Sequence, residues 1–292
     1  MLLLYFLTVI GMNFEVQAAV RPVVMSAPLT FDIPIDYNRE VQWWIKHFQG
    51  PGRPVFSTWL KRSSRYLPSI QQTLSRNGLP QDLAYIVMIE SGFSSSAVST
   101  ANAVGPWQFI EDTGERWGLT INWWLDERRD IDKSTKAAAK YLLYLHRLFG
   151  SWYLAAASYN TGENRIQKLV QKFGTKNFWN LSSKGALHYE TKDYIPKLIA
   201  AMLIAKAPSL YGFRDLAPQK PISSERFSVP GGTHLHLIAD LLNVSRDSLK
   251  DLNPELLRGF VPQSVSSHMI RIPNGTSARL SQILRERITL AN

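Results

Sequence analysis

The sequence predicts a mainly α protein, in which one large helical domain precedes a small β-α-α-β unit. Through residues 37–207, apolar residues recur at the three- and four-residue spacing of amphipathic helices. After Ala207-Pro208 the pattern changes to short alternating stretches that are typical of strands, with two brief helical patterns between them. The length of 292 residues agrees with one large domain plus a small one.

The N-terminal residues 1–18 have the features of a secretory signal peptide. The apolar run of residues 1–10 is too short to span a bilayer, and Val16-Gln17-Ala18 has the small residues of a cleavage site. The usual basic residues are missing, so a buried helix or an uncleaved anchor stays open as an alternative. We therefore predict an exported protein of the periplasm or cell envelope, in which residues 19–36 form an extended arm.

Capping and helix-breaking residues indicate where the helices of the first domain begin and end. Gly78 ends the second apolar stripe, and Pro80 opens the next helix in its first turn, where a missing N–H costs little. Asp132 or Ser134 can cap the long helix that Gly150 ends. Further helices are expected over residues 152–159, 164–173 and 190–205, the last with a kink at Pro196.

The second unit is expected over residues 225–274, after a linker of residues 208–224 and before a helical tail of residues 275–292. Its strands are predicted at 227–229 and 269–272, and its helices at 235–242 and 247–252. We expect the helical domain to fold without residues 221–292.

Composition restricts the chemistry and the partners. The chain has no cysteine, which excludes disulfides, thiol catalysis, cysteine-bound metals and a lipid anchor on cysteine. The net charge of +10 favours an anionic partner, and because no nucleic-acid motif accompanies it, we expect attraction to anionic envelope surfaces instead. His234 and His236 lack a third metal ligand, so no metal or other cofactor is expected. We expect a monomer.

Glu90 is the most unusual residue of the helical domain. It completes an otherwise apolar helical face and comes directly before Ser91-Gly92, where the helix should end. A carboxylate at the end of a buried stripe is costly unless it is paired, hydrogen-bonded or protonated. A structural ion pair or a helix cap is the alternative to a catalytic role.

Other polar and aromatic residues could form a site around it. Small residues, Trp107 and Gln108 share one loop, while Tyr159 and Asn160 end a helix, an alternation of flat faces and neutral hydrogen-bonding groups that suits a sugar chain. The pairs Trp43-Trp44 and Trp123-Trp124 are expected in the core. Asp126, Glu127 and Asp130 have Arg128 and Arg129 among them, which favours a surface ion-pair loop over second catalytic carboxylates.

Four ordered elements resemble the catalytic domain of the lytic transglycosylases, a goose-lysozyme-like family that cleaves bacterial peptidoglycan. They are Glu90-Ser91, Gly105-x-x-Gln108, Ala157-x-Tyr159-Asn160 and Glu190-Thr-x-x-Tyr194. The resemblance covers residues 37–207 and implies a lysozyme-like fold. It assigns Glu90 as the acid/base and Ser99 as the residue that orients it. It also implies glycan contacts for Ser91, Gln108, Tyr159, Asn160, Glu190 and Tyr194.

The same resemblance implies a reaction without water. Glu90 would protonate the glycosidic oxygen between MurNAc and GlcNAc, and then take the proton of the MurNAc C6 hydroxyl, giving a 1,6-anhydro-MurNAc end. A lysozyme-like hydrolase would instead need a second carboxylate to act on water or on the sugar. A non-catalytic peptidoglycan-binding protein is the third interpretation.

The second unit resembles a degenerate LysM module, a small glycan-binding fold. Its likeness rests on Phe227-x-Val229, Leu252-Asn253-Pro254 and Ile270-x-Ile272. Thr233-His234 departs from the usual Asp-Thr pair. The resemblance implies peptidoglycan glycan strands as the partner, while binding by this unit is left open.

Overall fold

The computed structural model describes residues 29–291, so the predicted signal peptide lies outside the described residues. The described part of the arm, residues 29–36, has no regular structure. The Asp32 carboxylate accepts hydrogen bonds from the backbone N–H groups of Gln81 and Asp82, and Ile33 is buried. These contacts hold Asp32 and Ile33 against the helical domain.

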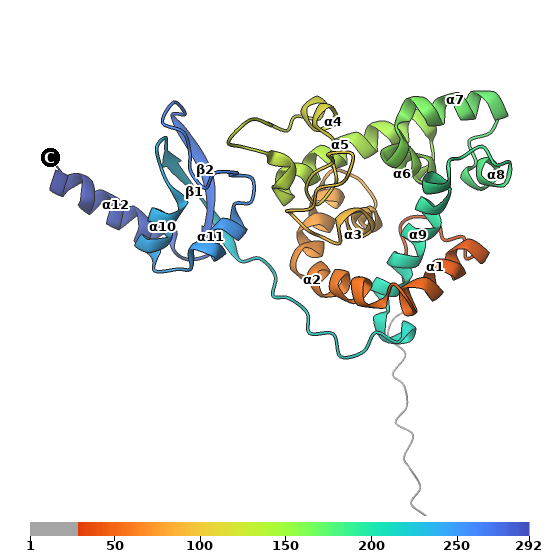
Figure 1. Ribbon diagram of the computed structural model, residues 1–292, viewed down its shortest axis with the longest axis horizontal. Helices are drawn as coiled ribbons and strands as arrows, with labels where there is room; N and C mark the ends of the chain where they lie inside the picture. Colours follow the sequence, from red (N-terminus) through yellow and green to blue (C-terminus); the bar gives the residue numbers. More distant parts are fainter. Residues whose placement is uncertain (1–28, 292) are drawn as a thin grey trace, which may run out of the picture. The chain divides into compact units, whose positions relative to one another are not determined.

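Helices form most of the described chain, and the predicted mainly α class is confirmed (Figure 1). The elements of the first domain, including three 3₁₀ turns labelled η, are α1 (Arg39–Gln49), α2 (Arg53–Arg76), η1 (Gln81–Ala84), α3 (Tyr85–Ser91), α4 (Glu111–Arg116), η2 (Glu127–Arg129), α5 (Ile131–Phe149), α6 (Trp152–Thr161), α7 (Glu163–Phe173), α8 (Phe178–Ser183), α9 (Tyr189–Lys206) and η3 (Pro208–Tyr211). No helix within residues 29–291 is long and apolar enough to cross a membrane.

Local signals explain where these helices begin and end. Gly150 adopts φ 70° after α5, a left-handed conformation that glycine accepts without strain. The predicted cap of α5 was wrong by two to four residues. The N-cap is Asp130, whose carboxylate accepts hydrogen bonds from the N–H groups of Asp132 and Lys133 at 2.8 and 2.9 Å. This cap uses the carboxylate nearest the free N–H groups of the first turn.

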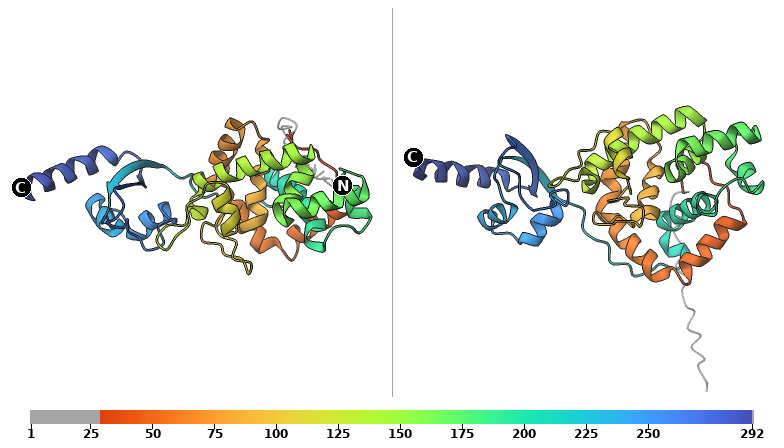
Figure 2. Two further views of the ribbon diagram at one scale, coloured as in Figure 1. Left: turned by 90° about the horizontal axis from the view of Figure 1, so that it is seen from above. Right: turned by 45° about the horizontal axis from the view of Figure 1, so that its top comes forward.

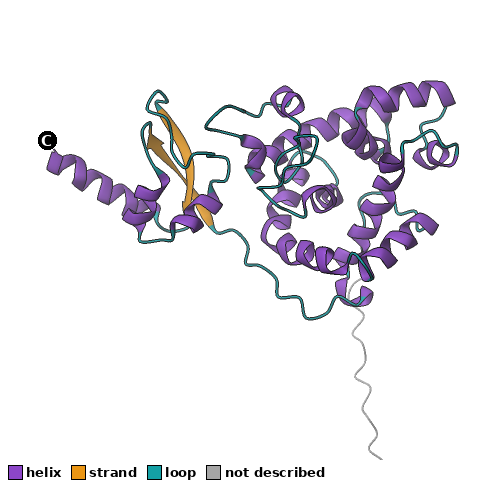
Figure 3. Cartoon of the chain, in the orientation of Figure 1, coloured by secondary structure: helices purple, strands orange, loops and turns teal. Residues whose placement is uncertain are grey.

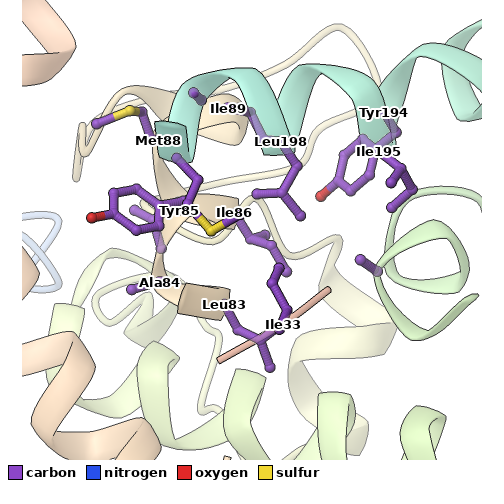
Figure 4. Packing of buried hydrophobic residues seen from close by; sticks show 14 of the residues in the cluster. Ile33, Leu83, Ala84, Tyr85, Ile86, Met88, Ile89, Tyr194, Ile195 and Leu198 are labelled. Atoms are coloured by element: carbon purple, nitrogen blue, oxygen red, sulfur yellow. The ribbon is translucent and has the colours of Figure 1, made fainter. Parts of the chain in front are cut away.

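Helix α9 is the centre of the domain and packs against α1, α3 and α6 (Figures 1 and 2). Its residues 194–196 and 198–204 are buried, so it is apolar around most of its circumference, as expected of a core helix. Figure 4 shows Leu198 of α9 close to Ile86 of α3. This packing fixes α3, and therefore Glu90, against α9.

The C-terminal unit has the predicted β-α-α-β order, followed by a helix (Figure 3). Its elements are β1 (Ser224–Pro230), α10 (Leu235–Leu242), α11 (Arg246–Leu252), β2 (Ser267–Pro273) and α12 (Ser277–Ala291). The strands are antiparallel, with Phe227 opposite Ile270. Val229, Ile238 and Ile270 are among the residues of its core.

Two residues of the helical domain belong to this second core. Trp124 and Leu125, from the loop before η2, are buried in the same cluster as the strands and helices of the C-terminal unit. The Asp126 N–H donates to the Glu255 carbonyl, and the Leu257 N–H donates to the Trp124 carbonyl, each at 2.9 Å. The two parts therefore share a core, which argues against the expectation that the helical domain folds without residues 221–292.

Candidate active site

A cleft of about 730 Å³ lies in the helical domain and brings most of the predicted site residues together. We call it the cleft throughout. Its lining includes Glu90, Ser99, Gln108, Tyr159, Asn160, Glu190 and Tyr194. These residues come from α3, α6, α9 and the loop between α3 and α4. Four segments that are far apart in sequence thus form one concave surface.

Glu90 lies in the last turn of α3, where the helix ends abruptly. Gly92 has φ 57°, and a Cβ atom there would lie 2.0 Å from Cδ1 of Trp59. Only glycine combines this conformation with so close an approach. The helix therefore ends at Ser91, and the Glu90 side chain is half-buried where α3 meets the cleft.

Neighbouring groups shift the pKa of the Glu90 carboxyl in opposite directions. Burial raises the pKa of the Glu90 carboxyl, because desolvation disfavours the charged form. The Tyr194 hydroxyl donates a hydrogen bond of 2.6 Å to Oε1 of Glu90, and this bond, together with the charge of Lys197, lowers the pKa. The carboxyl can therefore hold a proton at a higher pH than usual, and the carboxylate is supported once the proton leaves.

Lys197 is a site residue that the sequence interpretation missed. Its Nζ donates to the Ile89 carbonyl at 3.2 Å and lies 5.6 and 5.8 Å from the ring centroids of Trp44 and Trp59. Burial lowers the pKa of Lys197, while the negative charge of Glu90 raises it. A signal was available, because residues 190, 194 and 197 lie on one face of a helix.

Three hydrogen bonds hold the loop that carries Gln108. The Ser91 hydroxyl donates to the Pro106 carbonyl and the Tyr159 hydroxyl to the Trp107 carbonyl, each at 2.7 Å. Gln108, with φ 51°, donates from Nε2 to the Gly105 carbonyl at 2.8 Å. Ser91 thus binds the loop, whereas Tyr159 and Gln108 also line the cleft.

Ser99, predicted to orient Glu90, lines the cleft and also stabilises its own loop. Its hydroxyl accepts hydrogen bonds from the N–H groups of Ala101 and Ala103 at 3.2 and 3.0 Å. The hydroxyl that donates to Glu90 here is that of Tyr194. A direct contact between Ser99 and Glu90 stays a prediction.

The remaining predicted residues lie at the more open part of the lining. The Asn160 side-chain carbonyl accepts a hydrogen bond of 3.3 Å from the Thr191 hydroxyl, which joins α6 to α9. Glu190 is exposed and accepts a hydrogen bond of 3.4 Å from the Tyr189 hydroxyl. Both side chains retain hydrogen-bonding capacity toward a ligand in the cleft.

A further carboxylate, that of Glu163, also lines the cleft. It accepts hydrogen bonds from Arg116 at 2.7 Å and from the Tyr141 hydroxyl at 2.9 Å. Burial alone would raise its pKa, but hydrogen bonds from its own backbone, Arg116 and Tyr141 hold the pKa of Glu163 below its ordinary value. Glu163 is therefore an ionised, partnered carboxylate and a poor proton donor.

The acidic segment 126–130 is an ion-pair segment, but it is not on the surface. Asp126, Glu127 and Asp130 are all buried. Their partners are Arg128 at 2.9 Å for Asp126, Lys133 for Glu127, and Arg271 at 2.6 Å for Asp130. The prediction of a surface loop was wrong because one of these partners comes from the C-terminal unit.

The four tryptophans expected in the core divide into two groups. Trp124 is buried and Trp44 is half-buried, but Trp43 and Trp123 are 57% and 61% exposed. In a helix, residues 43 and 44 point about 100° apart, so one apolar face does not hold both.

No cluster of three or more His, Asp or Glu side chains that could hold a metal occurs among the residues that the structure describes.

Comparison with known proteins follows the same division of the chain. Residues 68–182 match the family Transglycosylase SLT domain, and residues 224–286 match the family Lytic transglycosylase MltD, LysM-like domain. In both of its domains, the chain resembles the lytic transglycosylases.

Individual relatives agree with this resemblance. Two proteins named Membrane-bound lytic murein transglycosylase D, from Escherichia coli K12 and O6:H1, are 32% identical over 197 residues, which is 66% of this chain and 43% of theirs. The chain thus spans less than half the length of these relatives. A Putative tributyltin chloride resistance protein of Alteromonas sp. (strain M-1) is 37% identical over 122 residues, or 41% of this chain and 59% of that protein.

A solved structure, an inactive mutant of the lytic transglycosylase Slt from Pseudomonas aeruginosa, also matches. It is 22% identical, with a TM-score of 0.40, over 51% of this chain and 24% of that chain.

Proposed function

We propose that this chain is a peptidoglycan lytic transglycosylase that cleaves the β-1,4 bond between MurNAc and GlcNAc without water. The observation that carries the proposal is the Glu90 carboxyl at the cleft, whose pKa is raised by burial and whose Oε1 accepts the 2.6 Å hydrogen bond of Tyr194. One group that can first donate and then accept a proton is what this reaction needs.

In the first step, protonated Glu90 gives its proton to the glycosidic oxygen, and the bond from that oxygen to C1 of MurNAc breaks. The N-acetyl group of MurNAc supports the positive charge at C1. Glu90 is then a carboxylate, which the Tyr194 hydroxyl and the charge of Lys197 stabilise.

In the second step, the C6 hydroxyl of the same MurNAc attacks C1, and Glu90 takes the hydroxyl proton. The new bond from O6 to C1 closes the 1,6-anhydro ring, and Glu90 is protonated again. An internal nucleophile gains from proximity and needs no activated water. The partnered state of Glu163 supports this scheme, because a free second carboxylate is the usual requirement for hydrolysis.

The other cleft residues are proposed to bind and orient the glycan. Gln108, Tyr159, Asn160 and Glu190 offer hydrogen-bonding groups along the lining, while Ser91 supports the loop and Ser99 orients Glu90. Residues 37–207 would be the catalytic domain, and residues 225–274 a LysM-like unit that retains the enzyme on peptidoglycan. We place the protein in the periplasm or cell envelope, exported by residues 1–18, as a monomer attracted to anionic surfaces by its net charge of +10.

The test is mass spectrometry of purified peptidoglycan digested in ¹⁸O-water. A transglycosylase releases 1,6-anhydro ends that carry no label at MurNAc C1. If most product instead carries ¹⁸O at a reducing end, the enzyme is a hydrolase, and Glu190 becomes the first residue to examine as the base. If no soluble fragment appears, the non-catalytic interpretation replaces the proposal.

A further inference from the structure

Trp43 is a large aromatic side chain displayed on the surface of α1. The helix buries Val41, Ile45 and Phe48 against the core, which turns Trp43 outward. His47, one helical turn later, stacks on the Trp43 ring with centroids 5.4 Å apart and an angle of 8° between the planes. Trp44 meets the same ring edge-on at 5.0 Å. The ring plane is therefore fixed, although 57% of the residue is exposed.

A hollow of about 200 Å³ lies beside this ring. Its lining consists of Arg39, Glu40, Trp43, Trp44 and Asp193, and we call it the side hollow. Trp44 and Asp193 also line the cleft, so the side hollow and the cleft share a wall. The side hollow is therefore directly adjacent to the cleft.

Asp193 of α9 connects the lining of the side hollow to the surroundings of Glu90. Asp193 directly precedes Tyr194, whose hydroxyl binds Glu90. A chain bound at Glu90 can therefore pass Asp193 and Trp44 before it reaches Trp43.

The chemistry of the lining fits a sugar ring. The Trp43 ring offers a flat apolar surface, Glu40 and Asp193 accept hydrogen bonds, and the Arg39 guanidinium donates them. Sugar hydroxyls both donate and accept, so they can use both kinds of group. Burial and the nearby charge of Glu40 raise the pKa of Asp193, whereas Lys192 and Lys197 lower it. The Arg39 guanidinium offsets the charge of one of the two carboxylates, which leaves a formal charge of −1 on the lining.

We propose that the side hollow is a remote sugar subsite, which binds a ring of the same glycan strand whose bond lies at Glu90. The inference rests on the proposed function and adds that activity depends on the length of the glycan strand. Helix α1 lies before residues 68–182, so this subsite is built by a part of the chain outside the matched SLT region. The enzyme would consequently prefer strands long enough to cover both the cleft and Trp43.

Peptide-free glycan strands of increasing length test the proposal, with the full chain and the variant Trp43→Ala. For strands that reach the side hollow, we expect KM to rise about tenfold, the size of one aromatic stacking contact, with kcat unchanged. For the shortest strand that is cleaved, both constants should stay within about twofold of the unmodified chain. Glu40→Gln should give a smaller change with the same dependence on length.

Trp123→Ala is the matched control, because Trp123 is 61% exposed and lines neither the cleft nor the side hollow. It should leave the length dependence unchanged. The subsite would be overturned if Trp43→Ala raised KM equally for glycan strands of all lengths. It would also be overturned if KM rose only for strands that carry peptides. Wild-type kinetics of Trp43→Ala on every strand would overturn it as well. Absence of anhydro product from the unmodified chain would refute the proposed function instead, so the two failures are distinguishable.

Discussion

Glu90 and Glu255 are both carboxyl groups whose pKa is raised by burial, yet they differ in their access to a cavity. Glu90 lies where α3 meets the cleft, with Tyr194 as its hydrogen-bond donor. Glu255 is 1% exposed and lies in the C-terminal unit, where burial and the charge of Asp130 raise its pKa to about 7. A perturbed pKa is common to catalytic and structural carboxyls. The open cavity beside Glu90 distinguishes the two.

The group around Glu255 is an ion network that joins the two parts of the chain. Arg271 donates from Nη2 to Asp130 at 2.6 Å and to Asp132 at 2.8 Å, and its Nη1 lies 3.8 Å from Oε1 of Glu255. Burial alone would raise the pKa of Asp130, but the charge and hydrogen bond of Arg271 hold it below its ordinary value. One buried arginine thus balances carboxylates from both parts.

The largest expected effect is a loss of turnover, which we expect for a substitution of Glu90 but not of Glu255. Glu90→Gln keeps the shape of the side chain but transfers no proton, so turnover should fall by about 10²–10⁴-fold with folding retained. Glu255→Gln, the matched control, should stay within about twofold of the unmodified chain. Release of anhydro-MurNAc, measured by mass spectrometry, checks both. Undiminished release by Glu90→Gln would remove Glu90 from the mechanism.

The second expected effect concerns stability. Arg271→Met leaves buried carboxylates without their cation and should reduce the free energy of unfolding by about 3–5 kcal/mol. Arg226→Met removes an exposed partner of Asp132 and should cost about 1 kcal/mol or less. Urea unfolding followed by circular dichroism measures the difference. Equal losses for the two variants would show that the network does not join the two parts energetically.

The third expected effect is a change of pH dependence. The Tyr194 hydrogen bond lowers the pKa of Glu90, so Tyr194→Phe should raise it. Because the first step needs protonated Glu90, the alkaline limb of kcat/KM should move to higher pH. The carboxylate formed in that step loses a donor, so kcat should fall by about tenfold to a hundredfold.

A pH–rate profile compares this variant with Tyr159→Phe, which removes a hydrogen bond to the Trp107 carbonyl instead. Tyr159→Phe should leave the alkaline limb in place. An alkaline limb that moves to lower pH in Tyr194→Phe would contradict the assigned role of the hydrogen bond.

Features that depend on neighbours in sequence were predictable. Glu90 stood out because it completes an apolar helical face before a glycine, and the glycine at position 150 ends α5 as expected. The order of elements in the C-terminal unit followed from short alternating stretches. In each case the physical cause lies within one or two helical turns, where periodicity and capping act.

Features that depend on distant partners were not predictable. Asp130 meets Arg271 across 141 residues of sequence, so nothing near the acidic segment indicated that it is buried. The Tyr194 hydroxyl reaches Glu90 across 104 residues. The exposure of Trp43 and the position of Lys197 were accessible in principle, because both follow from helical geometry once the buried face is known.

The shared core has a consequence for exchanging the C-terminal unit of this chain. The segment between η3 and β1 has the sequence of a linker, although Gln219 and Ile222 donate hydrogen bonds to carbonyls of α2. A fusion that joins a foreign LysM-like unit at this segment would leave Trp124 without its apolar neighbours and Asp130 without Arg271. A working exchange would have to transfer the loop before η2 and the start of α5 together with the C-terminal unit. The transferable piece is therefore discontinuous in sequence, and one of its segments lies within the helical domain.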